Sequence, residues 1–293
     1  RIRGLFIQRE SDGDWTVLLR GAGKLAPGES LQFCQGQATA GDSARAADGG
    51  LAPWVAELIQ RGPRGRWRIR VRHAHAAHLP GDPARVLHTV GRMPLPPYIG
   101  RGAEQDARDE TDRRRYQTVY AAKDGAIAAP TAGLHFTAKL LDRLSQGGIE
   151  ILPVTLHVGY GTFAPIEVDN LAEHDMHAEY CEISTEVAAQ LRATRAAGGR
   201  VVAVGTTSAR VLESAWRANT GQSGYAGWTR LFCYLPCTFC GAGALLTHFH
   251  LPGSTLIALV MAFAGIDHIR AAYAHAIEQH YRFFSYGDAM LLI

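Results

Sequence analysis

The chain has 293 residues, of which 47% are hydrophobic and 19% charged, a composition typical of a soluble globular protein large enough for two domains. No apolar run reaches the roughly 18 residues that would span a bilayer, and the first residues lack the apolar stretch of a signal peptide. Five unevenly spaced cysteines do not form a secreted disulfide framework. We therefore expect a cytoplasmic protein without a membrane partner, and the missing initial Met suggests a fragment.

Positive charge is concentrated in the first third of the chain. Residues 1–100 hold 14 Lys and Arg against 8 Asp and Glu, whereas the remainder holds 16 against 19. This asymmetry favours a polyanionic partner for the first part of the chain. An excess of arginine from a GC-rich gene would give the same count.

Residues 1–90 are predicted to form a small β-barrel-like domain. Short strands are expected at Gly4–Gln8, Trp15–Leu19 and Arg66–Arg72, separated by turns rich in Gly, Asp and Pro. Such spacing is typical of a small barrel or sandwich. The Ala-, Gly- and Asp-rich segment 37–53 is predicted to be a loop.

One predicted strand carries a row of arginines. Arg66, Arg68 and Arg70 alternate with apolar residues, and Arg64 and Arg72 extend the row, so period 2 places the arginines on one face. Guanidinium groups about 7 Å apart could follow a phosphate backbone. The alternative is the solvated outer face of a sheet.

A proline-rich segment, residues 91–98, separates this domain from a second one at 91–293. Strands and helices alternate beyond it, which predicts an α/β domain with a mainly parallel sheet flanked by helices. Helices are expected at 105–121, 137–146, 185–197, after Thr207, 254–264 and 267–281, and strands at 126–129, 149–158, 179–183, 200–204, 229–234, 243–248 and 289–293.

The stretch from Gly125 to Thr137 is the first candidate site. A short apolar run is followed by Pro130, a turn of small residues and His135 at the start of a helix. Free backbone N–H groups at such a turn can hold a ligand, which makes Thr131 and Gly133 candidate binding residues. An ordinary turn with a surface histidine is the alternative.

A second candidate site follows the predicted strand 200–204. Gly205, Thr206, Thr207 and Ser208 lead into a helix that also carries Arg210. Hydroxyls and N–H groups at a helix start suit a carboxylate, a phosphate or ribose hydroxyls. Helix capping alone would explain one hydroxyl, but not three.

Histidines gather at three places in the second domain: His157 before a glycine turn with Gly159 and Thr162, His174 with His177, and His248 with His250. The last pair, at i and i+2 on a strand, could bind a metal, but further ligands at metal spacing are missing, so no metal site is predicted. Roles as proton carriers or ligand contacts fit these histidines better.

Three cysteines also form a pattern. Cys233, Cys237 and Cys240 have C-x-x-x-C-x-x-C spacing, which resembles the iron–sulfur triad of radical S-adenosylmethionine enzymes. Those enzymes usually carry the triad near the start of their barrel. Three ordinary thiols near a strand are the preferred interpretation.

Eight stretches, in order, make the second domain resemble the S-adenosylmethionine:tRNA ribosyltransferase-isomerase family of queuosine biosynthesis. They cover nearly all of residues 91–293, whereas residues 1–90 resemble the family's inserted barrel only loosely. The stretches are Met93–Ile99, Tyr116–Tyr120, Ala128–Phe136, Thr155–Phe163, His174–Tyr180, Val204–Arg210, Thr247–Leu256 and Tyr281–Met290.

The resemblance implies transfer and isomerisation of the ribosyl part of S-adenosylmethionine onto 7-aminomethyl-7-deazaguanine in a tRNA anticodon. The product would be epoxyqueuosine, with adenine and methionine released. S-adenosylmethionine would be a ribosyl-donating substrate, no other cofactor is implied, and tRNA would be the macromolecular partner. The oligomeric state stays open, with a monomer as the working expectation.

The implied reaction needs a base that removes a proton next to the sulfonium. The candidates are His135, His157, His177 and His250. The donor would contact Thr131, Gly133, Gly159, Thr162, Gly205, Thr206, Thr207, Ser208 and Arg210, and the tRNA would contact Arg66, Arg68 and Arg70.

The chain departs from the family pattern in three places. The segment that usually precedes the barrel is absent, His248 stands where asparagine is usual, and residues 233–243 replace an aromatic, Pro–Gly run. Two alternatives therefore stay open. One is a radical S-adenosylmethionine enzyme that uses the three cysteines, and the other is a truncated, inactive tRNA-binding module.

Overall fold

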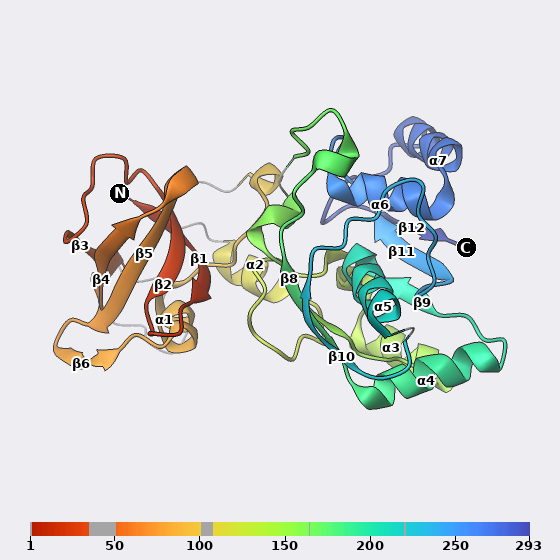
Figure 1. Cartoon of the computed structure of the whole chain (residues 1–293), viewed down its shortest axis with the longest axis horizontal. Helices are drawn as coiled ribbons and strands as arrows, with labels where there is room; N and C mark the ends of the chain where they lie inside the picture. Colours follow the sequence, from red (N-terminus) through yellow and green to blue (C-terminus); the bar gives the residue numbers. More distant parts are fainter. Residues whose placement is uncertain (1, 35–50, 101–107, 164, 220) are drawn as a thin grey trace. The chain divides into compact units, whose positions relative to one another are not determined.

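A computed structural model describes residues 2–34, 51–100, 108–163, 165–219 and 221–293. The chain divides into two units, Arg1–Arg114 and Arg115–Ile293 (Figure 1). The proline-rich segment 91–98, where the sequence predicts the boundary, falls within the first unit.

The first unit is built on six antiparallel strands. Their order is β1-β2-β5-β4-β3, and β6 pairs with β5. Its elements are β1 (Arg3–Arg9), β2 (Trp15–Arg20), β3 (Ser30–Cys34), β4 (Leu51–Arg61), η1 (Pro63–Gly65), β5 (Arg66–His73), β6 (Ala76–Pro80), α1 (Pro83–Val90), η2 (Pro97–Ile99) and α2 (Asp109–Arg115), whose last residue begins the second unit.

The three strands predicted in the first unit are confirmed as β1, β2 and β5. Closure into a barrel is not confirmed, because in the described residues β1 and β3 end the path of paired strands. The loop predicted at 37–53 lies mostly outside the described residues, and its last three residues belong to β4.

Alternation along β5 builds the core of this unit. Trp67, Ile69 and Val71 are buried with Trp15 of β2, while the intervening arginines lie on the opposite face. The Trp15 indole donates a hydrogen bond to the Gly81 carbonyl at 3.2 Å, which satisfies its one polar group.

The second unit contains two three-stranded sheets. The order of one is β10-β8-β7 and that of the other β12-β11-β9. The elements are η3 (Thr131–His135), α3 (Ala138–Gln146), β7 (Thr155–His157), η4 (Tyr160–Phe163), η5 (Leu171–Glu173), β8 (Glu179–Ile183), α4 (Thr185–Ala196), β9 (Val202–Val204), α5 (Gly205–Asn219), β10 (Tyr225–Thr229), β11 (Ala244–His248), α6 (Thr255–Ala264), α7 (Ile266–Glu278) and β12 (Ala289–Leu292).

The fold is mixed α/β, but the mainly parallel sheet predicted from the sequence is wrong. Of the described strand pairs, β9 with β11 is parallel and the others are antiparallel. Strands β7 and β8 are joined by a segment whose described part contains the short 3₁₀ helices η4 and η5, so no α-helical crossover forces them to run in the same direction.

Two predicted strands are also wrong. Residues 126–129 form no strand, although the Ile127 amide donates to the Val158 carbonyl at 2.9 Å. The strand predicted at 229–234 lies earlier in the chain, because β10 occupies Tyr225–Thr229 and only Thr229 is shared. Both runs are short and apolar, and periodicity alone cannot assign such runs.

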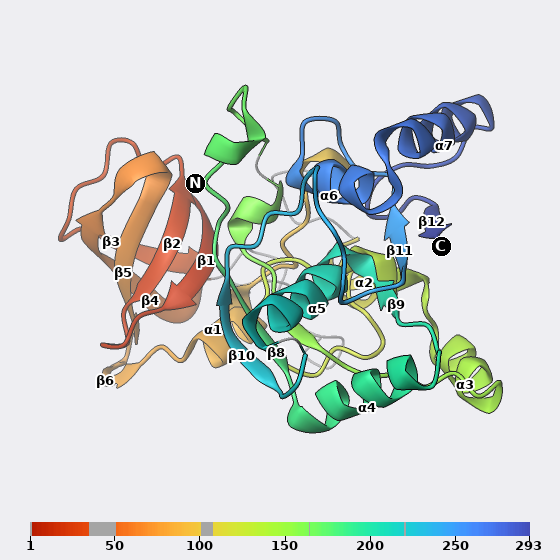
Figure 2. The same cartoon turned by 45° about the vertical axis from the view of Figure 1, so that its right-hand side comes forward.

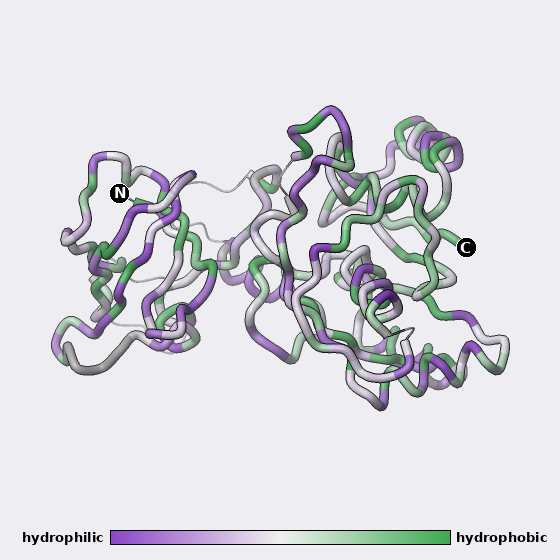
Figure 3. The backbone as a smooth tube through the Cα atoms, viewed as in Figure 1, coloured by the Kyte–Doolittle hydropathy of each residue, from purple (hydrophilic) through white to green (hydrophobic). Residues whose placement is uncertain are grey.

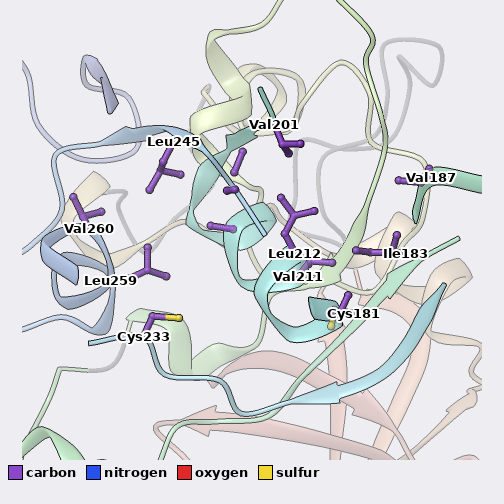
Figure 4. Packing of buried hydrophobic residues seen from close by; sticks show 14 of the residues in the cluster. Cys181, Ile183, Val187, Val201, Val211, Leu212, Cys233, Leu245, Leu259 and Val260 are labelled. Carbon is purple, nitrogen blue, oxygen red and sulfur yellow. The ribbon is translucent and has the colours of Figure 1, made fainter. Parts of the chain in front are cut away.

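Helix α5 lies between the two sheets of the second unit (Figures 1 and 2). It packs in a cluster of buried residues that includes Val211 and Leu212 of α5, Cys181 of β8 and Leu245 of β11 (Figure 4). Hydrophobic and hydrophilic residues are mixed along α4 (Figure 3), and its buried residues are Val187 and Ala188.

A membrane-spanning helix is not found among the described residues. The helices α6 and α7 pass a test of length and hydropathy only as a pair, and a bend of 114° separates them.

The core around α5 predicts a clear contrast between two leucines. Leu245 of β11 is fully buried, whereas Leu291 of the neighbouring strand β12 is 56% exposed. Leu245→Ala should lower the free energy of unfolding by about 2–5 kcal/mol, because it leaves a cavity. Leu291→Ala should lower it by roughly 0.5 kcal/mol or less. Urea denaturation measures both, and equal losses would contradict the assigned core.

Candidate active site

The parallel pair β9 and β11 brings two strand ends to one edge of a sheet. Leu246 lies opposite Val204, so both strands run toward the same edge. There β9 leads directly into α5 at Gly205, and β11 ends at His248. The carboxyl edge of parallel strands is a common ligand site in α/β proteins.

A chain of hydrogen bonds crosses this edge. The His248 Nδ1 lies 3.1 Å from the Thr131 hydroxyl oxygen, and its Nε2 lies 3.1 Å from the His135 Nε2. Thr131 and His135 are the two ends of η3, which contacts both β11 and α5. His248 therefore holds both ends of the turn that the sequence singled out.

Burial keeps His248 neutral. Its side chain is almost entirely buried, and this burial, with a smaller effect of the nearby His135, lowers the pKa of His248 from 6.5 to about 4. A neutral imidazole carries one ring proton, so His248 can donate from one nitrogen and accept at the other. The hydrogen bonds to Thr131 and His135 use both nitrogens.

The two possible proton orders give His135 different roles. If His248 donates from Nδ1 to Thr131, its Nε2 accepts the Nε2 proton of His135, and the His135 Nδ1 becomes an acceptor. In the reverse order the His135 Nδ1 carries a proton. His135 is exposed, and the described residues provide no hydrogen-bond partner for its Nδ1. In either order this atom is the one that can meet a substrate.

Asp288, which immediately precedes β12 in the chain, lies near His135. The pKa of Asp288 is lowered, first by the hydrogen bond from the Arg282 amide at 2.7 Å and also by the charge of His135. The carboxylate therefore adds a negative charge next to an exposed imidazole.

His250 does not share the position of His248. Its Nε2 lies 2.8 Å from the Thr247 hydroxyl, and its amide donates to the Tyr273 hydroxyl at 2.6 Å. Burial, with a smaller effect of His248, lowers the pKa of His250 to about 3. Since β11 ends at His248, the two histidines do not form the strand pair predicted from the sequence.

The start of α5 lies against η3. Gly205 has a φ of +90°, and a Cβ atom added to it would lie 3.6 Å from the Ala132 Cβ, so the two turns are in contact. Thr206 is buried, and Thr207 and Ser208 are half-buried in the first turn of the helix. The N–H groups of a first helical turn have no partner within the helix.

Arg210 connects α5 to the other sheet. It is buried, forms an ion pair with Glu179 of β8, and donates from Nε to the Leu231 carbonyl at 3.1 Å. The Gly159 amide donates to the same carboxylate at 2.8 Å. The Arg210 Nη2 has no hydrogen-bond partner in the part of the chain that the structure describes.

The other predicted residues have different surroundings, and of them Gly133 lies within η3 itself. The His157 ring stacks on Tyr180 at 5.9 Å, and the His177 ring lies 4.9 Å from Tyr160. Gly133 packs against Tyr120, where a Cβ atom would clash with the hydroxyl. Thr162 belongs to η4, and its side chain is outside the described part.

Sequence reasoning missed His248 as a member of the site. The available signal was its departure from the asparagine that is usual at this position. Of the positions predicted from the sequence, Thr131, His135 and the start of α5 lie together in the structure. No described contact joins His157 or His177 to them.

Two of the three cysteines pack in the core of the second unit: Cys233 is buried in the cluster around α5, and Cys237 packs against it. Burial raises the pKa of Cys233 to about 12, with a smaller effect of Cys237, and Cys237 accepts a hydrogen bond from the Arg217 Nη2 at 3.3 Å. Across the described ranges, no three Cys, His, Asp or Glu side chains are grouped as metal ligands.

The arginines of β5 are already engaged within the first unit. Arg68 donates from Nε to the buried Asp14 at 3.0 Å, and Arg70 does so at 2.9 Å. Arg72 pairs with Glu57 at 3.2 Å. Arg64 lies in η1 and not in the strand, so the predicted row of five is shorter.

Comparison with known proteins identifies the class of protein that carries this fold and site. The family described as "Queuosine biosynthesis protein" matches residues 1–292, and the chain belongs to this family.

The chain is similar to proteins named S-adenosylmethionine:tRNA ribosyltransferase-isomerase. The one from Herminiimonas arsenicoxydans is 57% identical over 213 residues, which cover 73% of this chain and 61% of that protein. The one from Ruegeria sp. (strain TM1040) is 44% identical over 294 residues, which cover 100% of this chain and 76% of that protein. The match therefore spans less than two thirds of the length of the first relative.

A solved structure is also similar. It is the crystal structure of an S-adenosylmethionine tRNA ribosyltransferase from Thermotoga maritima, which is 30% identical. The match covers 100% of this chain and 75% of that chain, with a TM-score of 0.47.

The lowered pKa values of His248 and His250 lead us to expect a loss of stability in acid. As the pH falls below about 6.5, the unfolded chain takes up protons at these histidines, whereas folded His248 does so only near pH 4. Stability should therefore fall with pH across this window. Replacing His248 by Asn should make the slope shallower by about 1 kcal/mol per pH unit near pH 5. Urea denaturation at several pH values measures the slope.

The exposed His268 of α7 provides the matched control. His268→Asn should leave the slope close to that of the parent chain. An unchanged slope in His248→Asn would contradict the assigned neutral state of His248.

Proposed function

We propose that this chain transfers and isomerises the ribosyl part of S-adenosylmethionine onto 7-aminomethyl-7-deazaguanine in a tRNA anticodon, in the cytoplasm. Adenine and methionine are released. The observation that carries the proposal is the hydrogen-bonded chain Thr131–His248–His135 at the carboxyl edge of β9 and β11, in a member of the queuosine family. The names of the relatives supply the ribosyl transfer and isomerisation between S-adenosylmethionine and tRNA, and the accepting base and the products come from the family resemblance.

His135 is the proposed base. The reaction requires removal of a proton from a carbon next to the sulfonium. His135 is an exposed residue of η3, and Ala132 of the same turn packs against Gly205 at the start of α5. Acting as a base requires the proton order in which the His135 Nε2 donates to His248. His248 is then a positioning residue, because it fixes the tautomer and the orientation of the His135 ring.

The start of α5 is the proposed site for the donor. The free N–H groups and hydroxyls of Thr206, Thr207 and Ser208 suit the carboxylate or the ribose of S-adenosylmethionine. The unpartnered Nη2 of Arg210 adds a buried positive group on the same helix. Gly133, Gly159 and Thr162 remain proposed donor contacts, but the geometry supports them less than it supports α5.

The first unit is proposed to contact the tRNA through Arg66, Arg68 and Arg70. Arg70 is the better phosphate ligand of the last two, because its side chain is 54% exposed and that of Arg68 is 37% exposed. Both arginines share Asp14, so part of their charge is neutralised within the fold. The expected contribution to RNA binding is therefore smaller than the sequence suggests.

Adenine release tests the proposed function. The chain is incubated with S-adenosylmethionine and a tRNA that carries the deazaguanine precursor, and free adenine and modified tRNA are measured. His135→Ala should lower kcat by about 10²- to 10⁴-fold, the usual range for a lost general base. His248→Asn, which retains a hydrogen-bonding side chain, should keep more activity than His248→Leu.

The exposed His268 again provides the control, and His268→Ala should turn over at the parental rate. Activity of His135→Ala within a few fold of the parent would remove His135 as the base. Salt-dependent tRNA binding without any adenine release would instead support the truncated binding module.

Salt dependence tests the tRNA surface. Arg70→Gln should reduce the slope of log affinity against log salt by about 0.7–0.9, the value for one lost phosphate contact. Arg68 remains to pair with Asp14, so the fold is preserved. Lys139→Gln, at an exposed position of α3, is the control and should leave the slope unchanged. An unchanged slope in Arg70→Gln would contradict the phosphate contact and support the alternative that the arginines of β5 form a solvated outer face of the sheet.

A further inference from the structure

Three aromatic rings form a row across the β10-β8-β7 sheet. Strand pairing places His157 opposite Tyr180 and Tyr180 opposite Trp228. The His157 and Tyr180 rings are stacked at 5.9 Å with an interplanar angle of 19°, and Tyr180 meets Trp228 edge-to-face at 5.9 Å. We call His157, Tyr180 and Trp228 the aromatic row.

The aromatic row lies on the outer face of the sheet. The residues next to Tyr180 along β8, Glu179 and Cys181, are buried, while Tyr180 itself is half-buried. Trp228 is 67% exposed, the most exposed of the tryptophans and tyrosines that the structure describes as large exposed side chains. A lone exposed ring needs no explanation, but three neighbouring rings in register form one aromatic patch, whose outermost member is the exposed Trp228.

Cations flank the aromatic row. Arg230 follows Trp228 by two residues, and its side chain is 67% exposed, while Lys123 is 54% exposed. Each forms a surface ion pair, Arg230 with Asp175 and Lys123 with Glu182. Such pairs contribute little, so either cation can exchange its carboxylate for a phosphate. The surface thus combines aromatic rings, which can stack on nucleotide bases, with cations, which can pair with backbone phosphates.

The aromatic row is continuous with the candidate site through the chain. A Cβ atom on Gly125 would lie 2.8 Å from the His157 Nδ1, so the backbone at Gly125 packs against the inner end of the row. From Gly125 the chain leads directly to η3, which carries Thr131 and His135. One segment, residues 125–137, thus contacts the row at Gly125 and carries the proposed base, His135.

We propose that the aromatic row stacks unpaired bases of an RNA loop, with Trp228 as the outer platform and Arg230 on a flanking phosphate. The proposal rests on the proposed function, because an enzyme that modifies a base must take it out of its stack and leaves the neighbouring bases without stacking partners. Single-stranded RNA is recognised by such stacking on aromatic side chains, and a sheet face is a common platform for it.

RNA binding without turnover tests this proposal. A fluorescently labelled RNA stem–loop is titrated with the chain in the absence of S-adenosylmethionine, and the dissociation constant is read from anisotropy. Trp228→Ala should weaken binding by roughly 5- to 100-fold, the effect of losing one stacking ring. Trp228→Phe, which keeps a ring, should recover most of the affinity. The fully paired duplex of the same stem should bind equally to the parent and to Trp228→Ala.

Two comparisons separate stacking from other effects. Stacking carries no charge, so Trp228→Ala should leave the salt slope unchanged, whereas Arg230→Gln should reduce it by about 0.7. Ile277→Ala removes an apolar side chain that is 65% exposed on α7, and it should not change RNA affinity.

Unchanged stem–loop affinity in Trp228→Ala would overturn the proposal, and so would an equal loss of duplex binding. A change in self-association in place of RNA binding would overturn it as well, since the row would then be a protein contact. Because no turnover is measured, an inactive chain can still support the aromatic row. Conversely, an active chain with unchanged binding would keep the proposed function and end this inference.

Discussion

The parallel pairing of β9 with β11 is the constraint on which the candidate site depends. It places the start of α5 and the end of β11 at one edge, so that Gly205 and His248 are both within reach of η3. If β11 ran the other way, His248 would lie at the opposite end of its strand, and the chain from Thr131 to His135 could not form. The site is therefore a consequence of strand direction before it is a consequence of any side chain.

Helix α5 transmits this arrangement to the rest of the second unit. Its first turn faces η3, while Arg210 holds the antiparallel sheet through Glu179. Burying an ion pair costs desolvation energy, so further hydrogen bonds are needed to maintain it. Here the Gly159 amide donates to the Glu179 carboxylate, and the Arg210 Nε donates to the Leu231 carbonyl. Removing either charged partner would leave the other buried and unpaired, so the two sheets and α5 are held in one geometry.

Some of this could be predicted from the sequence and some could not. The alternation of arginine with Trp67 and Ile69 indicated β5, and the helices expected at 137–146, 185–197 and 254–264 correspond to α3, α4 and α6. These features are local, because they depend on the period of a strand or on the first turn of a helix. Strand direction is not local, because it depends on how the chain returns between strands, and alternation of strands and helices elsewhere in the domain does not determine the direction of β7 and β8.

The same distinction explains what was missed in the site. Thr131 and His135 are four residues apart and could be recognised as one motif, but His248 is 113 residues from His135 and 117 from Thr131 along the chain. Asp14 accepts hydrogen bonds from Arg68 and Arg70 and lies in a turn before the neighbouring strand. The alternation along β5 could not predict this partner. Each of these partners depends on tertiary packing, which spacing along the chain does not record.

The central claim is that His248 sets His135 as a base with a free Nδ1, and the protonation state of the two imidazoles tests it most directly. Nitrogen-15 labelled histidine allows long-range proton–nitrogen NMR spectra to be recorded near pH 7. We predict a proton on Nε2 and an unprotonated Nδ1 for His135, and for His248 a neutral ring with the proton on Nδ1. A neutral His135 ring with its proton on Nδ1, or a charged His248, would contradict the account.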